Sequence, residues 1–67
     1  MRPYTFKQIL TFMEVARQGS VSKAAERLFV TQPAVSMQLR QLEEAFGLAL
    51  VEPMGHNIKL THAGEIF

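Results

Sequence analysis

The sequence predicts a mainly α-helical fold in which three helices precede a short β-hairpin. Apolar residues recur at intervals of three and four up to Phe46, which is the spacing of packed helices. Beyond Gly47 the pattern changes to two short strand-like segments around a turn-rich stretch. The chain has 67 residues, of which 48% are hydrophobic, so one small domain with a single modest core is expected.

The composition excludes several kinds of protein. The chain contains no cysteine, which rules out disulfides and thiolate metal sites and fits a reducing cytoplasm. No apolar run approaches the roughly 20 residues that a membrane-spanning helix needs, so no membrane contact is expected. The N-terminal segment carries Glu14 within its periodic pattern, unlike a signal peptide. A net charge of +1 argues against an indiscriminate polyanion binder.

The first helix is expected from a cap at Thr5 to about Gly19, because glycine tolerates the left-handed conformation that ends helices. Its apolar residues repeat at helical spacing and should form the inward face: Phe6, Ile9, Leu10, Met13 and Ala16, widened by Phe12 and Val15. We interpret this stripe as core rather than as a cofactor site.

A short second helix is expected over 21–28, with Ser20 as its cap. Ala24 and Ala25 carry small side chains, which allow another helix to cross at a short distance. The alanine pair is therefore predicted to be buried where the second and third helices meet.

Phe29 and Val30 are expected to form the turn between the second and third helices, with their apolar side chains filling the corner. Thr31 should cap the third helix, and Pro33 falls in its first turn, where a missing N–H is no loss.

The third helix should end near Phe46, with Gly47 as its terminator, and it has two different faces. Apolar residues at intervals of four, three and four should pack inward: Val35, Leu39, Leu42 and Phe46. Polar and compact residues occupy the other side: Gln32, Pro33, Ser36, Met37 and Arg40.

The outward face of the third helix is free of acid, since no Asp or Glu lies between Glu26 and Glu43. Phosphates repel carboxylates, whereas glutamine and arginine can pair with adenine and guanine edges. The pattern therefore predicts a DNA-recognition helix, with Arg40 on phosphate. The alternative for Arg40 is a surface pair with Glu43 or Glu44.

Two short strands are expected over 48–52 and 57–60, around a turn at 53–56. Thr61 can then cap a fourth helix. The apolar Phe67 at the end of so short a helix predicts that the natural protein continues.

Four segments carry a resemblance: AAERL, TQPAVS, QLEE followed by FGLAL, and LTHAG. In this order and spacing they resemble the DNA-binding domain of LysR-type transcriptional regulators. QPAVSMQLRQLE is also similar to the carbon-fixation-operon regulators of that family. The resemblance implies a winged helix-turn-helix domain over 1–60, with the helix-turn-helix proper at 21–40 and the start of a linker helix at 61–67.

The resemblance also implies partners and a setting. Members are bacterial, cytoplasmic regulators that bind inverted repeats in double-stranded DNA as homodimers or homotetramers. A small-molecule effector is expected to bind a C-terminal domain outside these 67 residues, and no cofactor is expected within them. Because linker helices pair in the family and little of that helix follows Thr61, this chain should be monomeric or weakly associated.

Carried over by position, the DNA contacts of the family fall on Gln32, Pro33 and Ser36, with Thr31 near the backbone at the start of the helix. Met37 stands where an arginine is frequent, so an apolar contact, for example with a thymine methyl group, is expected there.

The expected wing departs from the family pattern. Pro53 and His56 stand where many members carry arginine. Proline cannot replace such a contact, and histidine is only partly charged near neutral pH. His56 is therefore predicted to bind DNA weakly.

Other classes of function have less support. An enzyme would need a nucleophile–base pair, a glycine-rich phosphate loop or facing carboxylates, and Glu43 and Glu44 are adjacent and point different ways. His56 and His62 lack a third metal ligand at suitable spacing. A helical protein-interaction module remains the alternative, and DNA retention that falls steeply with salt would distinguish the two.

Overall fold

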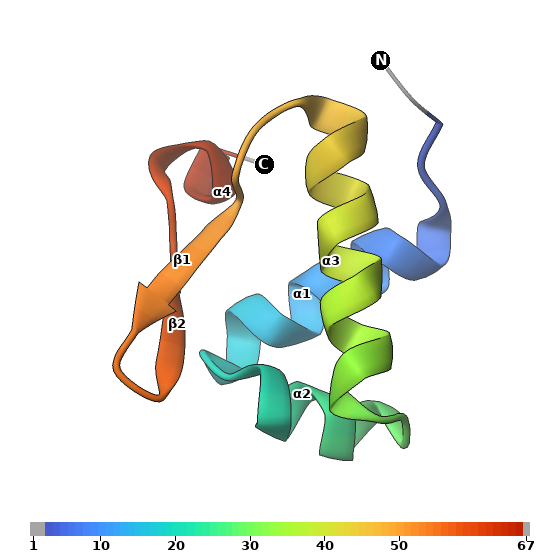
Figure 1. Cartoon of the computed structure of the whole chain (residues 1–67), viewed down its shortest axis with the longest axis vertical. Helices are drawn as coiled ribbons and strands as arrows, with labels where there is room; N and C mark the ends of the chain where they lie inside the picture. Colours follow the sequence, from blue (N-terminus) through green and yellow to red (C-terminus); the bar gives the residue numbers. More distant parts are fainter. Residues whose placement is uncertain (1–2, 67) are drawn as a thin grey trace.

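The computed structural model describes residues 3–66, and it consists of three helices, a two-stranded antiparallel hairpin and a short fourth helix (Figure 1). The elements in chain order are α1 (Phe6–Gln18), α2 (Val21–Leu28), α3 (Gln32–Phe46), β1 (Val51–Met54), β2 (Asn57–Leu60) and α4 (His62–Ile66). The predicted mainly α-helical class, with three helices before a hairpin, is confirmed. Phe67 lies outside the described residues. The expectation that the natural protein continues beyond it therefore stays a prediction.

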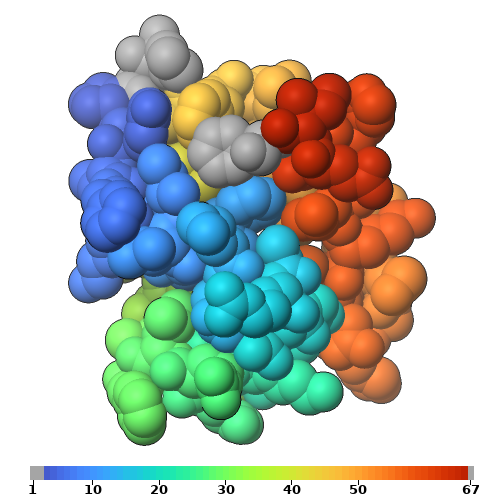
Figure 2. Space-filling view, turned by 180° about the vertical axis from the view of Figure 1, so that it is seen from behind, coloured from blue at the N-terminus to red at the C-terminus, as the bar shows by residue number. Residues whose placement is uncertain are grey.

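The arrangement separates two ends of the molecule. In Figure 1, α3 stands in front of α1, and α2 crosses below them. The start of α3, the whole of α2 and the turn of the hairpin lie toward the lower end. α4 lies toward the opposite end, and the space-filling view from behind shows the same separation (Figure 2).

The core lies where α1, α2 and α3 cross and is completed by the segment that leads into the hairpin. Its buried residues are Phe12, Val15, Ala24, Ala25, Val35, Leu39, Leu42 and Leu50. Ala24 and Ala25 are only 0% and 4% exposed, which confirms their predicted burial.

Local capping explains why the helices begin and end where predicted. The side chains of Thr5, Ser20 and Thr31 each accept a hydrogen bond from a backbone N–H in the first turn that follows. Gly19 and Gly47 adopt left-handed conformations with φ of 65° and 69° and end α1 and α3. The predicted caps and terminators of these helices are confirmed.

The buried face of α1 differs from the predicted one. Phe12 and Val15 are buried, but Phe6, Leu10 and Met13 are 74%, 43% and 51% exposed. Their expected places are taken by two polar residues, Gln8 and Thr11, which are buried at the contact with the rest of the domain.

Hydrogen bonds make the burial of these polar residues tolerable. The N–H of Thr5 donates to Oε1 of Gln8 at 3.0 Å, and Nε2 of Gln8 donates to Oε1 of Gln41, in α3, at 2.9 Å. The hydroxyl of Thr11 donates to the carbonyl of Lys7 at 2.9 Å. Because both side chains are satisfied, α1 can turn a face toward the core that apolar periodicity does not reveal.

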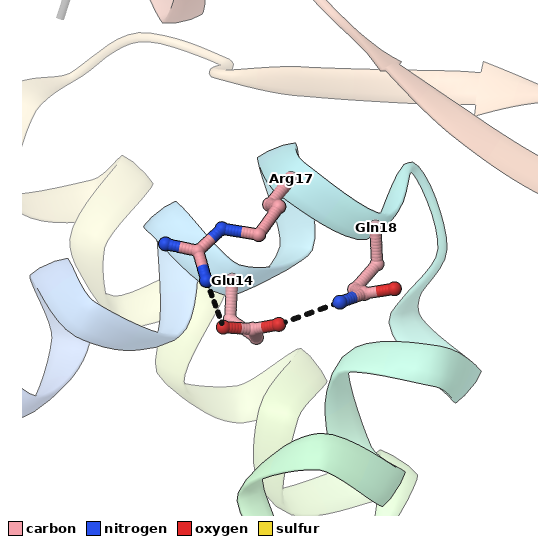
Figure 3. Close-up of polar contacts among 3 residues, drawn as sticks. All are labelled: Glu14, Arg17 and Gln18. Atoms are coloured by element: carbon pink, nitrogen blue, oxygen red, sulfur yellow. Dashed lines mark hydrogen bonds and ion pairs between the residues drawn. The ribbon is translucent and has the colours of Figure 1, made fainter.

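The last turn of α1 is held by a carboxylate (Figure 3). Oε2 of Glu14 accepts a hydrogen bond from Nε2 of Gln18 at 2.7 Å, and Oε1 lies 3.6 Å from the guanidinium of Arg17. The carbonyl of the following Gly19 accepts a hydrogen bond from the N–H of Ile58 at 3.0 Å. This backbone hydrogen bond joins the end of α1 to β2.

The turn between α2 and α3 does not fill the corner, and that prediction is wrong. Phe29 is 94% exposed and Val30 is 42% exposed. Phe29 has a left-handed φ of 59°. Its N–H donates to the backbone carbonyl of Glu26, and the N–H of Val30 donates to the backbone carbonyl of Ala25. This is the hydrogen-bond pattern of a Schellman motif, so backbone closure rather than side-chain burial ends α2.

The hairpin begins later than predicted. β1 covers Val51–Met54 rather than 48–52, while β2 has the predicted bounds of 57–60. Met54 pairs with Asn57, so the turn contains only Gly55 and His56, and φ is positive at Gly55. Glycine in the first position favours such a two-residue turn. Pro53 is tolerated because both strands of a two-stranded sheet are edge strands.

α4 packs closely against the segment before the hairpin. Thr61 caps it as predicted, because its hydroxyl accepts the N–H of Gly64 at 3.1 Å and also donates to the carbonyl of Ala49 at 2.6 Å. Gly64 is buried against the carbonyl of Leu50, and a Cβ at this position would overlap that oxygen. A side chain would therefore separate α4 from the core.

Candidate nucleic-acid interface

The outward face of α3 has the composition that the sequence predicts. The side chains opposite the core are all exposed: Gln32, Pro33, Ser36, Met37 and Arg40. The opposite face is formed by Val35, Leu39 and Leu42, which are 1%, 5% and 0% exposed. The expected Phe46 is half-buried, and Ala45, absent from the predicted stripe, is buried. The two-faced character of α3 is confirmed.

The start of α3 is electrostatically suited to an anion. Thr31 is exposed, and its hydroxyl accepts the N–H of Ala34 at 3.2 Å. Pro33 occupies the first turn, and no acidic residue lies in this turn. The N-terminal end of a helix carries a partial positive charge, so it attracts phosphate.

Arg40 forms no ion pair within residues 3–66, so the alternative pair with Glu43 or Glu44 is not found there. Glu43 has another role. Its carboxylate accepts the N–H groups of Leu50 at 2.8 Å and Val51 at 3.3 Å. Arg40 therefore remains on the exposed face of α3.

The turn of the hairpin carries His56 as an exposed side chain. Further along the strands, Lys59 pairs with Glu52 at 3.4 Å, and the two residues face each other in the sheet register. This ion pair offsets the positive charge of Lys59. The turn points toward the same end of the molecule as the start of α3 (Figure 1).

Sequence reasoning missed one residue beside the recognition face. Nε2 of Gln32 donates to the hydroxyl of Ser22, in the first turn of α2, at 3.3 Å. The two residues are ten positions apart, and only the geometry of the turn brings them together.

The described residues offer little support for other kinds of site. Within residues 3–66, no three His, Cys, Asp or Glu side chains lie close enough to share a metal ion. The described helices include none that is long and apolar enough to cross a membrane. The acid-free face of α3, with the hairpin beside it, is the candidate interface.

The chain is similar in sequence to known bacterial regulators. The family described as "Bacterial regulatory helix-turn-helix protein, lysR family" matches residues 6–65. The HTH-type transcriptional activator CmpR of Synechocystis sp. is 49% identical over 65 residues, which cover 97% of this chain and 21% of the relative. The RuBisCO operon transcriptional regulator of Allochromatium vinosum is 50% identical over 64 residues, covering 94% of this chain and 21% of the relative.

The solved structures agree with the sequence matches. The crystal structure of a CbnR_DBD–DNA complex superposes with a TM-score of 0.90 at 40% identity, covering 94% of this chain and 72% of that one. The expected similarity to a carbon-fixation-operon regulator is confirmed by the second relative. The present chain spans about a fifth of the length of the curated relatives, which are 21% covered.

Proposed function

This chain belongs to the lysR family of bacterial regulatory helix-turn-helix proteins, and we propose that it binds an inverted-repeat DNA operator with α3 in the major groove. The observation that carries the proposal is the exposed, acid-free face of α3 opposite a fully buried stripe. The winged helix-turn-helix fold and the family make the chain a DNA-binding domain rather than an enzyme.

The side chains of α3 divide into two roles. Gln32 and Ser36 read base edges by hydrogen bonding, while Pro33 and Met37 make apolar contacts, for example with thymine methyl groups. All four are exposed on one face of the helix. This division of roles predicts that changes at Gln32 or Ser36 alter base preference.

Thr31 and Arg40 act on the sugar–phosphate backbone. Thr31 lies at the cap of α3, beside the positive end of the helix, and Arg40 is exposed without an ion pair in the described part of the chain. Contacts of this kind hold the helix in register but carry no sequence information.

The wing contributes little binding energy in this proposal. His56 is the exposed residue of the turn, and Lys59 is paired with Glu52. An imidazole and a lysine that is already paired with a carboxylate make weaker contacts with phosphate than an unpaired arginine would. Binding therefore depends mainly on α3.

The intact regulator is proposed to act in the bacterial cytoplasm as a homodimer or homotetramer, with a small-molecule effector bound by a domain outside these 67 residues. The support is indirect: the relatives are about five times longer, since this chain covers 21% of each. Two recognition helices must lie about 34–36 Å apart to enter successive major grooves on one side of a duplex, which a symmetric dimer achieves.

Salt titration tests the proposal. Fluorescence anisotropy should detect binding of the 67-residue chain to a labelled duplex pool, and the logarithm of affinity should fall linearly with the logarithm of salt concentration. Each phosphate contact contributes a slope of about −0.9, so Arg40→Ala should make the slope shallower by about that amount.

A different result would favour the helical protein-interaction module. Absence of binding at low salt, or binding that does not change with salt, would contradict a DNA-binding role. Gln41→Ala is the matched control, because Gln41 lies in the same helix but bonds to Gln8 of α1. Its salt slope should equal that of the parent.

A further inference from the structure

A hydrogen bond joins the two helices of the helix-turn-helix at the exposed surface. Nε2 of Gln32, the first residue of α3, donates to the hydroxyl of Ser22 in α2 at 3.3 Å. Both residues are exposed, so neither is held by burial. The contact ties the first polar residue of the recognition face to the neighbouring helix.

Ser22 is not needed to start α2. The cap is Ser20, whose hydroxyl accepts the N–H of Lys23 at 3.2 Å and whose side chain is buried. Ser22 follows two positions later, and its hydroxyl serves Gln32 instead. Removing the hydroxyl of Ser22 therefore leaves the cap of α2 intact.

The direction of this hydrogen bond has a consequence for base reading. A glutamine amide offers one carbonyl oxygen and two N–H groups. Pairing with adenine uses the oxygen, which accepts from N6, and one N–H, which donates to N7. Donation to Ser22 uses the other N–H and leaves the adenine-reading pair available. Guanine presents two acceptors, O6 and N7, and would need both N–H groups of the amide.

We propose that Ser22 is a positioning residue, which orients the amide of Gln32 so that it selects adenine in the major groove. The proposal rests on the base contact of Gln32 under the proposed function. Glutamine is long and flexible, and holding it before DNA arrives reduces the conformational entropy lost on binding. Ser22 thereby contributes to specificity without touching the base.

A double-mutant cycle on base preference tests the proposal. The 67-residue chain selects duplexes from a library with a randomised half-site, and affinities are then measured for duplexes that differ at one base pair. Four proteins form the cycle: the parent, Ser22→Ala, Gln32→Ala and the double variant. Ser22→Thr, which keeps a hydroxyl, is the conservative control.

The parent should prefer an A·T pair at one position by about 5- to 150-fold, which is the discrimination expected of one bidentate pair. Gln32→Ala should abolish that preference. Ser22→Ala should reduce it by about 2- to 10-fold at the same base pair, which is the worth of one hydrogen bond. The double variant should behave like Gln32→Ala alone, and Ser22→Thr should keep the preference.

Three results would overturn the proposal in distinguishable ways. An unchanged preference in Ser22→Ala, with loss in Gln32→Ala, would show that Gln32 reads the base without help from Ser22. An equal loss of affinity on all duplexes, in both backgrounds, would assign Ser22 to phosphate. A preference that survives Gln32→Ala would refute the base contact itself. Because preference compares two duplexes with the same protein, partial unfolding of a variant cancels.

Discussion

The carboxylate of Glu43 accepts the backbone N–H of Leu50 at 2.8 Å, which joins the last part of α3 to the residue that enters the core before β1. The same oxygen also accepts the N–H of Val51 at 3.3 Å. Leu50 is only 2% exposed, so its N–H has little access to water as an alternative partner. The wing is thereby attached directly to the proposed recognition helix.

Loss of this attachment should destabilise the domain. Glu43→Ala leaves the N–H groups of Leu50 and Val51 without their acceptor and should lower the free energy of unfolding by about 1–3 kcal/mol. Glu43→Gln keeps an acceptor oxygen and should lose less. Urea unfolding followed by circular dichroism measures the difference. Equal stability of Glu43→Ala and the parent would mean that these hydrogen bonds contribute nothing.

Truncation of Gln32 should relax sequence preference rather than abolish binding. Gln32→Ala should lose about 1–3 kcal/mol of discrimination at one base pair of the half-site, because one bidentate contact disappears. Competition between specific and random duplexes measures the effect. Gln41→Ala, in the same helix but hydrogen bonded to α1, is the control and should keep the preference. If Gln32→Ala kept the same base-pair preference as Gln41→Ala, Gln32 would not contact a base.

A cation at the turn of the wing should strengthen binding to every sequence. His56→Arg should steepen the slope of log affinity against log salt by about 0.9, which corresponds to one phosphate contact. His62→Arg adds the same charge on α4, toward the opposite end of the molecule (Figure 1), and should leave the slope nearly unchanged. If the two variants behaved alike, the wing would not contact DNA.

The alanine pair of α2 should not tolerate larger side chains. Ala24→Leu and Ala25→Leu should each lower stability by about 1–3 kcal/mol, because both positions lie in the packed core at 0% and 4% exposure. Thermal unfolding followed by circular dichroism is the measurement. Ala49→Leu, at an exposed position, provides the control and should melt close to the parent.

The 67-residue chain should be monomeric or weakly associated at micromolar concentration. α4 covers only His62–Ile66, which offers too little apolar area to overcome the entropy lost on association. Sedimentation equilibrium distinguishes the states. A tight dimer would require an interface elsewhere, and the exposed side chains Phe6, Leu10 and Met13 of α1 would be the first to test by substitution.

Features fixed by neighbouring residues could be predicted from the sequence. The caps at Thr5, Ser20 and Thr31 and the terminators Gly19 and Gly47 act within one helical turn, so the bounds of the three main helices followed from local chemistry. The two-faced pattern of α3 was equally accessible, because helical periodicity reports which side packs inward.

Features that depend on distant contacts could not be predicted in this way. The buried face of α1 includes Gln8, which is satisfied partly by Gln41 of another helix. The late start of β1 places Leu50 outside the strand, where Glu43 binds its N–H. For the candidate site, Ser22 was missed because its partner Gln32 approaches only after the turn folds.

Leu50 also has a carbonyl group, and this group accepts the N–H of Thr61 at 3.1 Å, directly before α4. Leu50 therefore connects α3 and α4: its N–H binds Glu43 of α3, and its carbonyl binds the N–H of Thr61. Because Gly64 has no side chain, the backbone of α4 packs directly against the same carbonyl. In a longer member of this family, a change in the tilt of α4 would displace Leu50 directly. Leu50 would in turn displace Glu43 and with it α3, the helix proposed to read DNA.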